Sequence, residues 1–328
     1  MLTAHHIMII SGPTATGKTS ISLQLAQAWQ NLGGQAVIVN FDSLLFYQEL
    51  NIGTAKPTPA ERQICPHYGI DLSSVTQPLS AGDYRRFARP LINQLWALNP
   101  RPQIFLVGGS GFYLRALIKG MDEEKFAPEI SKEVEDLYQR QSITAIREEL
   151  AKVDPVSLTQ LHPHDHYRLQ RALIYFRATG QKMSQAKAAW NAARPYDFRE
   201  HDLPGPLIHL YLDLPKPDHA KIIAQRAQKM WEDGLEREAR ALIEQGKDTA
   251  RPTRAIGHQQ ALQYCRGQYP DLAACLADIN LATRHLAKAQ RTFFKRITPK
   301  IVADPRDPAL VATWLKKLQE DAPELDGA

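Results

Sequence analysis

The amino-acid sequence predicts an α/β protein, with a parallel sheet flanked by helices and an all-helical domain inserted into the fold. Short apolar runs alternate with helical patterns through the first third of the 328 residues, as in parallel sheets that are covered on both faces. A glycine-rich loop joins the first run to the first helical pattern. From residue 119 to residue 206, charged helical patterns follow one another with no strand-like run between them.

The first strand is expected at Ile7–Ile10, which leads into Gly-x-x-x-x-Gly-Lys-Thr at residues 12–19. A helical pattern follows from about Thr19 to Gln30. The glycines let backbone N–H groups turn inward, the helix N-terminus adds its dipole, and the lysine adds a full charge. This order predicts a P-loop NTPase-like sheet whose loop holds a polyphosphate, and the motif alone does not say which one. Thr19 is placed to bind Mg²⁺ through its hydroxyl.

Two further strands are expected at Ala36–Asn40 and Ile104–Val107, each of them a short apolar run. Between them a helix should begin after Ser80, because Ser80 and Asp83 have the spacing of a capping box. Pro90 lies inside the pattern that follows, and a proline at such a position predicts a kink or an early stop.

After the helical segment a strand returns at Pro206–Leu214, and helices continue to about residue 297. The longest of them is expected from Ile222 to Gly246, with a glycine stop. The last residues are acidic and small, and are expected to be disordered. The predicted organisation is a P-loop core over 1–118, a helical insertion domain over 119–206, a second, mainly helical part of the core over 207–318 and a disordered tail over 319–328.

Composition excludes several classes of protein. Hydrophobic residues make up 44% and charged residues 23% of the chain, as in ordinary globular proteins. The net charge of +5 permits a nucleic-acid partner without requiring one. Cys65, Cys265 and Cys275 are too few and too scattered for a zinc site or a disulfide framework, so we expect a reduced, cytoplasmic compartment. No signal-peptide pattern and no long apolar run is present, so no membrane segment is expected.

The second expected strand ends at Asp42 and Ser43, on the edge of the sheet that carries ligands in doubly wound folds. Asp42 has three interpretations at this point. It is a carboxylate in the outer shell of Mg²⁺, a base toward an acceptor substrate, or a cap for the segment that follows.

The third expected strand ends in Val-Gly-Gly-Ser-Gly, where Ser110 offers a hydroxyl to the same crevice. The glycines allow close backbone approach, and a tight turn without a ligand is the alternative. Between these strands, Lys56 lies in a polar turn and is a weak candidate for a phosphate contact.

Two helical patterns outside the P-loop core carry basic side chains. Arg168 and Arg171 lie three residues apart in a helix for which Asp165 is the expected N-cap. Near the end of the chain, basic residues follow helical spacing and form a single stripe: Arg284, Lys288, Arg291 and Lys295. Such arginines often form only a solvated face, but two basic stripes favour a large polyanion as partner. A turn is expected at residues 254–259, where His258 is either a binding residue or an ordinary core or surface histidine.

Taken in order, seven motifs resemble one family, the tRNA dimethylallyltransferases of the bacterial type. They are GPTATGKT, DSLLFY, NIGTAKP, VGGSGFYLRAL, HPHDHYRLQRAL, TRAIGHQQAL and ATRHLAKAQRTFFK, which together span nearly the whole chain. The resemblance implies a P-loop core with an inserted helical domain. It also implies transfer of a dimethylallyl group from dimethylallyl diphosphate to the exocyclic amine of the adenosine beside the anticodon.

The resemblance assigns roles to particular residues. It implies that the diphosphate is held by Gly12, Pro13, Thr14, Ala15, Thr16, Gly17, Lys18 and Thr19, with Mg²⁺ as cofactor on Thr19. Asp42 is implied as the base that takes the proton of the amine. Arg254 is implied to stabilise the leaving diphosphate together with Lys18. Ser110 stands where most members have threonine, and its hydroxyl should still serve in catalysis.

By the same resemblance, the residues that contact tRNA are Asp42, Ser43, Leu44, Leu45, Ser110, Tyr167, Arg168, Leu169, Gln170, Arg171, Arg254, Gly257, His258, Gln259, Lys288, Gln290, Arg291 and Lys295. The target base must be flipped out of its loop. Three positions depart from the family pattern. Leu45 replaces a frequent glutamine, Ala289 a frequent basic residue and Phe293 a frequent tryptophan, so a base contact and part of the phosphate grip are in doubt.

Three other functions remain open on the sequence alone. The first is an adenylate isopentenyltransferase that acts on AMP or ATP, although such a substrate requires neither a helical insertion nor basic stripes. The second is a P-loop small-molecule kinase, in which Asp42 would activate a hydroxyl. The third is a non-catalytic RNA-binding protein, which leaves the P-loop without a purpose. For the tRNA-modifying enzyme we expect a monomer.

Overall fold

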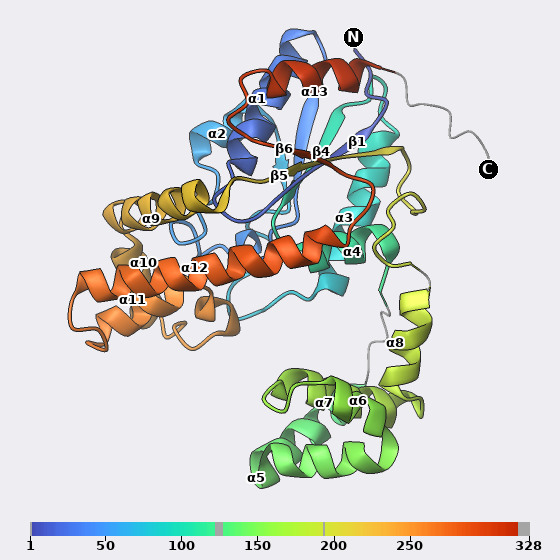
Figure 1. Cartoon of the computed structure of the whole chain (residues 1–328), viewed down its shortest axis with the longest axis vertical. Helices are drawn as coiled ribbons and strands as arrows, with labels where there is room; N and C mark the ends of the chain where they lie inside the picture. Colours follow the sequence, from blue (N-terminus) through green and yellow to red (C-terminus); the bar gives the residue numbers. More distant parts are fainter. Residues whose placement is uncertain (1, 122–126, 193, 321–328) are drawn as a thin grey trace. The chain divides into compact units, whose positions relative to one another are not determined.

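The computed structural model describes residues 2–121, 127–192 and 194–320. Contacts divide the chain into two compact units. The core unit comprises Met1–Gly120 and Tyr196–Ala328, and the helical unit comprises Met121–Pro195 (Figure 1). The helical unit is shorter than the expected insertion of 119–206, because Phe198 and Leu203 pack into the core unit. Of the tail expected to be disordered, residues 321–328 lie outside the described residues.

A six-stranded parallel sheet with the order β3-β2-β4-β1-β5-β6 forms the centre of the core unit. Its strands are β1 (Ile7–Ser11), β2 (Ala36–Asn40), β3 (His67–Tyr68), β4 (Gln103–Gly108), β5 (Leu207–Leu212) and β6 (Ile301–Ala303). The four strands expected from apolar runs are confirmed, and so is the P-loop NTPase-like fold class. The strands β3 and β6 were not expected, because each is only two or three residues long and lies at an edge of the sheet.

Helices cover both faces of this sheet. Along β1, Ile7 and Ile9 belong to one buried cluster, whereas Met8 and Ile10 belong to another, because successive side chains of a strand point to opposite faces. The first cluster includes side chains of α3 (Ala81–Trp96) and α4 (Gly111–Lys119), and the second includes side chains of α1 (Lys18–Asn31) and α13 (Leu310–Gln319). Figure 1 shows α1 and α13 side by side on one face. The result is a three-layer α/β core.

The helix α3 begins as expected and ends later than expected. Ser80 caps it, and the capping box with Asp83 is present. Pro90 lies inside the helix, which continues to Trp96, so the expectation of an early stop is wrong. The turns around and after the proline bury Ala88 and Ile92 against the sheet. This packing outweighs the hydrogen bond that proline cannot donate.

The long helix expected at Ile222–Gly246 is two helices, α9 (Lys216–Glu232) and α10 (Leu235–Glu244). The chain breaks at Gly234, which has a φ of 109°, a conformation that glycine adopts without strain. The remaining elements of the core unit are η1 (Ser43–Phe46), α2 (Pro59–Ile64), η2 (Arg251–Arg254), α11 (His258–Cys265) and α12 (Leu272–Lys295). A third buried cluster joins α9, α10, α11 and α12.

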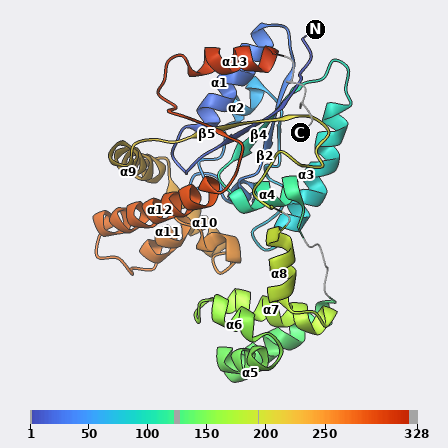
Figure 2. The same ribbon diagram turned by 45° about the vertical axis from the view of Figure 1, so that its right-hand side comes forward.

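The helical unit contains α5 (Pro128–Val153), α6 (Pro155–Gln160), α7 (His166–Thr179) and α8 (Met183–Ala192), and no strand occurs among its described residues (Figure 2). Val134 and Ile146 of α5 pack against Leu169 of α7 in the centre of this unit. Asp165 caps α7 through a hydrogen bond from the Arg168 N–H, as expected. In the described part of the chain, no helix combines the length and the apolar character needed to cross a membrane.

Candidate active site

The phosphate loop, residues 12–17, connects β1 to the first turn of α1. Gly12 has a φ of 152°, and a Cβ atom at this position would lie 2.3 Å from the Leu212 carbonyl oxygen, so no larger residue fits. Gly17 caps α1 with a φ of 75°. Inside the loop, the Thr16 hydroxyl donates a 2.8 Å hydrogen bond to the Pro13 carbonyl. The loop thus ends at a helix N-terminus, where backbone N–H groups attract anions.

Lys18 lies across this loop, with Nζ donating a 2.7 Å hydrogen bond to the carbonyl of Pro13. Desolvation of the ammonium lowers the pKa of Lys18 to about 8; the charge of Asp42 acts against this shift, and that of Arg226 adds to it. Its ammonium is therefore a poorly solvated cation, and a phosphate anion would supply the charge partner that it lacks.

Thr14 is the most firmly held residue of the loop. Its N–H donates to Oε1 of Gln290 at 2.8 Å, its carbonyl accepts from Nε2 of His219 at 2.8 Å, and its hydroxyl accepts from Nη1 of Arg226 at 2.6 Å. The three partners come from α9 and α12, more than 200 residues later in the chain. They fix the conformation of the loop before any ligand is present.

The tautomer of His219 follows from its two neighbours. Arg291 donates to Nδ1 of His219 at 2.7 Å, so the ring proton lies on Nε2 and is donated to Thr14. Burial lowers the pKa of His219, and the nearby Arg291 charge lowers it further, which keeps the ring neutral. Arg291 is itself paired with Asp213 at 2.7 Å.

Asp42 follows β2 and lies at the carboxyl edge of the sheet, as expected. Its N–H donates to Oδ1 of Asn40 at 2.8 Å, and its own Oδ1 accepts the N–H of Leu44 at 3.3 Å, so it also caps η1. The cap leaves the carboxylate half-buried and facing the same cavity as Lys18. Asp42 therefore caps η1 and lines the cavity at the same time.

The turn after β4 is joined to the other two strand ends. The Ser110 hydroxyl accepts the N–H of Ser43 at 3.1 Å and lies 3.2 Å from the Ser43 hydroxyl. Gln290 donates from Nε2 to the Gly109 carbonyl at 3.1 Å while it accepts the Thr14 N–H. The amide of Gln290 thus bridges the phosphate loop and this turn.

A cavity of about 1050 Å³ opens between these elements. Its walls include Thr14, Ala15, Gly17, Lys18 and Thr19 of the phosphate-loop motif, together with Asp42, Leu45 and residues 51–52 and 54–59. Arg226 of α9 completes one side. Of the three residues expected to be catalytic, Asp42 lines the cavity, whereas Arg254 and Ser110 are not among its described lining residues.

Arg226 lines this cavity, and the sequence analysis did not single it out. Its guanidinium is half-buried and donates to the hydroxyl of Thr14 and, at 3.3 Å, to the carbonyl of Thr54. Burial lowers the pKa of the Arg226 guanidinium, and the charge of Asp42 acts against this shift. The available signal was weak: Arg226, Lys229 and Asp233 follow the helical spacing i, i+3 and i+7, and all three line the cavity.

Two residues expected to contact tRNA are buried inside the protein. The side chain of His258 is 0% exposed and lies 2.7 Å from the carboxylate of Glu238. Leu169 is 0% exposed in the centre of the helical unit. Neither side chain reaches the surface, and contact of these two residues with tRNA stays an untested prediction. Gly257 is buried as well, and its N–H donates to Oε1 of Gln260.

Two expected phosphate ligands are occupied by protein partners. Nζ of Lys56 donates to the carbonyl of Tyr47 and to Asp71, both at 2.7 Å. Arg291, expected in an exposed stripe, is instead turned toward Asp213. The other members of that stripe, Arg284, Lys288 and Lys295, are exposed.

The remaining predicted tRNA contacts fall into two groups by exposure. The exposed ones are Tyr167, Arg168, Arg254, Gln259, Lys288 and Lys295, and the half-buried ones are Asp42, Ser43, Leu44, Leu45, Ser110, Gln170, Arg171 and Gln290. All of these side chains have some access to a partner. Their contact with tRNA stays a prediction.

The fold and the site define a class of protein: a P-loop protein in which Lys18, Arg226 and the carboxylate of Asp42 line one cavity at the carboxyl edge of a parallel sheet. The family model described as IPP transferase matches residues 45–297. A tRNA dimethylallyltransferase 1 of Trichlorobacter lovleyi is 35% identical over 88% of this chain and 90% of its own length. A tRNA dimethylallyltransferase of Thermobifida fusca is 34% identical over 97% of this chain and 91% of its own.

Solved structures agree with these sequence relationships. A tRNA isopentenylpyrophosphate transferase of Bacillus halodurans superposes with a TM-score of 0.66 and 26% identity, over 95% of each chain. A eukaryotic dimethylallyltransferase acting on tRNA shares the fold, with a TM-score of 0.72 and 22% identity, over 93% of this chain and 75% of that one. The chain belongs to the IPP transferase family.

Proposed function

We propose that this protein is a tRNA dimethylallyltransferase. It transfers the dimethylallyl group of dimethylallyl diphosphate to the exocyclic amine of the adenosine beside the anticodon and releases diphosphate. One observation carries the proposal: Lys18, Arg226 and the phosphate loop lie around the same cavity as the carboxylate of Asp42. One cavity therefore combines a site for the diphosphate leaving group with a base for the acceptor amine.

The diphosphate binds at the helix N-terminus of the phosphate loop, between Lys18 and Arg226. As the C–O bond of the substrate breaks, its electron pair moves onto the diphosphate oxygens, and both cations stabilise the negative charge that develops there. Because both are fixed by hydrogen bonds to the loop, at Pro13 and Thr14, little reorganisation is needed when the charge appears.

Asp42 is the base. The lone pair of the adenine amine is delocalised into the ring, so the amine attacks the first carbon of the dimethylallyl group only as a proton leaves it. The carboxylate of Asp42 accepts that proton while the C–N bond forms. The cavity of about 1050 Å³ lies at the upper end of the range for small-molecule sites, which supports simultaneous occupancy by the donor and a flipped base.

Mg²⁺ fits the cofactor position at Thr19. Thr19 lines the cavity, and its hydroxyl makes no hydrogen bond to any described residue. No cluster of three metal-ligating side chains occurs in the described part of the chain. This is compatible with Mg²⁺, which keeps several waters and uses substrate phosphates as ligands. When bound, the ion would neutralise charge on the diphosphate.

The tRNA is recognised by exposed side chains of both units. In the helical unit these are Tyr167, which is 61% exposed, and Arg168; in the core unit they are the exposed Arg284, Lys288 and Lys295 of α12. Cationic side chains bind phosphates, and an exposed aromatic ring can stack on an unpaired base. We propose that the protein acts as a monomer.

A transfer assay tests the function. Labelled dimethylallyl diphosphate is incubated with Mg²⁺, the protein and either unmodified tRNA, AMP or ATP. Label in tRNA alone, lost in Asp42→Ala, is the expected result. Label in AMP or ATP identifies an adenylate isopentenyltransferase instead, and consumption of unlabelled ATP without any label transfer identifies a kinase.

A further inference from the structure

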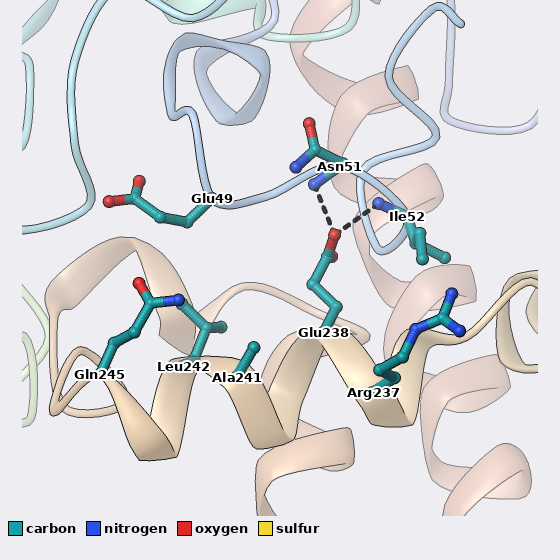
Figure 3. Close-up of a pocket in the computed structure, with 8 residues that line it drawn as sticks. All are labelled: Glu49, Asn51, Ile52, Arg237, Glu238, Ala241, Leu242 and Gln245. Atoms are coloured by element: carbon teal, nitrogen blue, oxygen red, sulfur yellow. Dashed lines mark hydrogen bonds between the residues drawn. The ribbon is translucent and has the colours of Figure 1, made fainter.

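A buried carboxylate outside the cavity holds one of its walls. Glu238 of α10 accepts hydrogen bonds from the backbone N–H groups of Asn51 and Ile52 at 2.9 Å each (Figure 3). It accepts the N–H of Gly53 at 3.1 Å. It also accepts the Nε2 proton of His258 at 2.7 Å. Its side chain is 9% exposed and that of His258 is 0% exposed. All four bonds converge on the two oxygens of one side chain.

The charge state of Glu238 agrees with this arrangement. Burial by itself raises the pKa of Glu238, but the hydrogen bonds from His258 and from the N–H groups of Ile52 and Gly53 outweigh it and leave the pKa lowered. A carboxylate can only accept hydrogen bonds, and here every partner is a donor.

The segment held by Glu238 is a tight turn over residues 51–55, which we call the 51–55 turn. It is closed by hydrogen bonds from the N–H of Ala55 to Ile52 and from the N–H of Lys56 to Asn51. A Cβ atom at Gly53 would lie 2.3 Å from Cε1 of His258, so the backbone rests directly on the imidazole ring. The position of the turn is thus determined from α10 and α11 together.

The opposite side of the 51–55 turn reaches the diphosphate site. The carbonyl of Thr54 accepts a 3.3 Å hydrogen bond from Nη2 of Arg226, whose Nη1 donates to Thr14 of the phosphate loop. The guanidinium is therefore held between the turn on one side and the loop on the other. A displacement of the turn would remove one of its two acceptors.

We infer that Glu238 is a positioning residue for diphosphate binding. It fixes the 51–55 turn, so that the carbonyl of Thr54 orients the guanidinium of Arg226 toward the phosphate loop. The inference rests on the proposed function, since it names a further residue on which binding of the same diphosphate depends.

The test replaces the carboxylate of Glu238, a hydrogen-bond acceptor, by an amide of the same size. In Glu238→Gln, one oxygen becomes an NH₂ group that faces N–H donors of the turn. Loss of hydrogen bonds to a charged group should weaken binding of pyrophosphate about tenfold and raise the KM for dimethylallyl diphosphate similarly. The KM for tRNA should stay unchanged. Glu236→Gln is the matched control, because Glu236 is on the same helix and pairs with Arg240 at the surface.

A double-mutant cycle separates positioning from a general structural role. If Glu238 acts through Arg226, Glu238→Gln should cause no further loss of pyrophosphate affinity in an Arg226→Gln background. An equal loss in both backgrounds, or unchanged affinity in Glu238→Gln alone, overturns the inference. The transfer of label to tRNA by the wild-type protein is measured in parallel. If the wild type transfers no label, the proposed function is contradicted, whereas the role of Glu238 is still decided by the pyrophosphate affinities.

The inference stays testable if Glu238→Gln fails to fold. Hydrogen exchange is then measured on peptides of the wild-type chain that cover the 51–55 turn, with and without pyrophosphate. Slow exchange without pyrophosphate is expected, because the turn is fixed before the ligand binds. Fast exchange that slows only after pyrophosphate is added overturns the inference.

Discussion

Arg226 in α9 donates a 2.6 Å hydrogen bond from Nη1 to the hydroxyl of Thr14, across 212 residues of sequence. The bond joins the phosphate loop to a helix that follows the fifth strand of the sheet. Nε of the same guanidinium is buried and has no partner among the described residues. Arg226 therefore combines a fixed orientation with an unused donor beside the cavity.

Replacing Arg226 by glutamine should weaken pyrophosphate binding about 10-fold to 100-fold, since hydrogen bonds to charged groups are the stronger class. Isothermal titration with pyrophosphate and Mg²⁺ measures the change. Arg240→Gln is the control, because Arg240 pairs with Glu236 on the surface. Equal affinities in the two variants would contradict the assignment.

Asp42→Asn should lower kcat by about 10²-fold to 10⁴-fold, the range for removal of a general base. Affinity for pyrophosphate should be retained. Asparagine caps helices as well as aspartate does, so the cap on η1 is kept and the effect is chemical. Steady-state transfer to tRNA provides the measurement, with Asp307→Asn as control, because Asp307 is exposed and its carboxylate accepts the N–H of Ala309. A variant that keeps the wild-type kcat would rule Asp42 out as the base.

Diphosphate affinity should fall as the pH rises above about 8. Desolvation lowers the pKa of Lys18 to about 8, so its ammonium is charged below this pH and neutral above it. Pyrophosphate titrations at several pH values, compared between wild type and Lys18→Arg, test this expectation, because the arginine stays charged and the ligand titrates equally in both. Parallel curves for the two proteins would show that Lys18 does not titrate in this range.

Stability should fall on acidification below about pH 6.5, partly because of His209. Burial lowers the pKa of this histidine from 6.5 to about 3, and Nε2 lies 2.6 Å from the Ser11 hydroxyl. The unfolded chain thus binds a proton that the folded chain excludes. The free energy of unfolding is fully present above the unfolded pKa and decreases below it, by up to about 1.4 kcal/mol per pH unit.

Urea unfolding between about pH 5 and pH 7.5 measures this slope. His209→Gln should be less stable at neutral pH and should show a flatter dependence on pH. His162→Gln, at an exposed position, should keep the wild-type slope. An unchanged slope in His209→Gln would mean that other groups cause the acid sensitivity.

The exposed cations of α12 should carry part of the salt dependence of tRNA binding. Arg284→Gln combined with Lys288→Gln should weaken binding and reduce the slope of log K against log salt by roughly 1.5 to 2. Arg291→Gln, which breaks the pair with Asp213, should leave this slope unchanged and weaken pyrophosphate binding through His219. The reverse pattern would place Arg291 on the tRNA surface.

The features that could be predicted are those with a local signal. β1, the phosphate loop and α1 are adjacent in sequence, and Asp42 directly follows an apolar run, so the loop and the carboxylate that line the cavity were both singled out. In contrast, β3 and β6 exist because β2 and β5 offer free edges, and Ile301 and Val302 of β6 are largely exposed. β3 is two residues long and β6 three, which is too short for a pattern of apolar residues to identify a strand.

The errors concern side chains whose role depends on distant partners. In the sequence, Arg226 cannot be distinguished from an ordinary surface cation of an amphipathic helix. Only the fold brings Thr14 within hydrogen-bonding distance of it. His258 lies in a motif that resembles a binding segment, yet the carboxylate of Glu238 holds it in the interior. Arg291 has the helical spacing of an exposed stripe, but Asp213 turns it inward. Periodicity predicts which face a residue occupies and carries no information about such pairings.

The three bonds that hold Thr14 also have a consequence for protein synthesis. Residues 12–17 are made long before the side chains that fix Thr14, which belong to positions 219, 226 and 290. A nascent chain therefore carries its glycine loop for most of translation without the groups that shape it. We expect the growing chain to acquire affinity for pyrophosphate only after Gln290, the last of these partners, has been made.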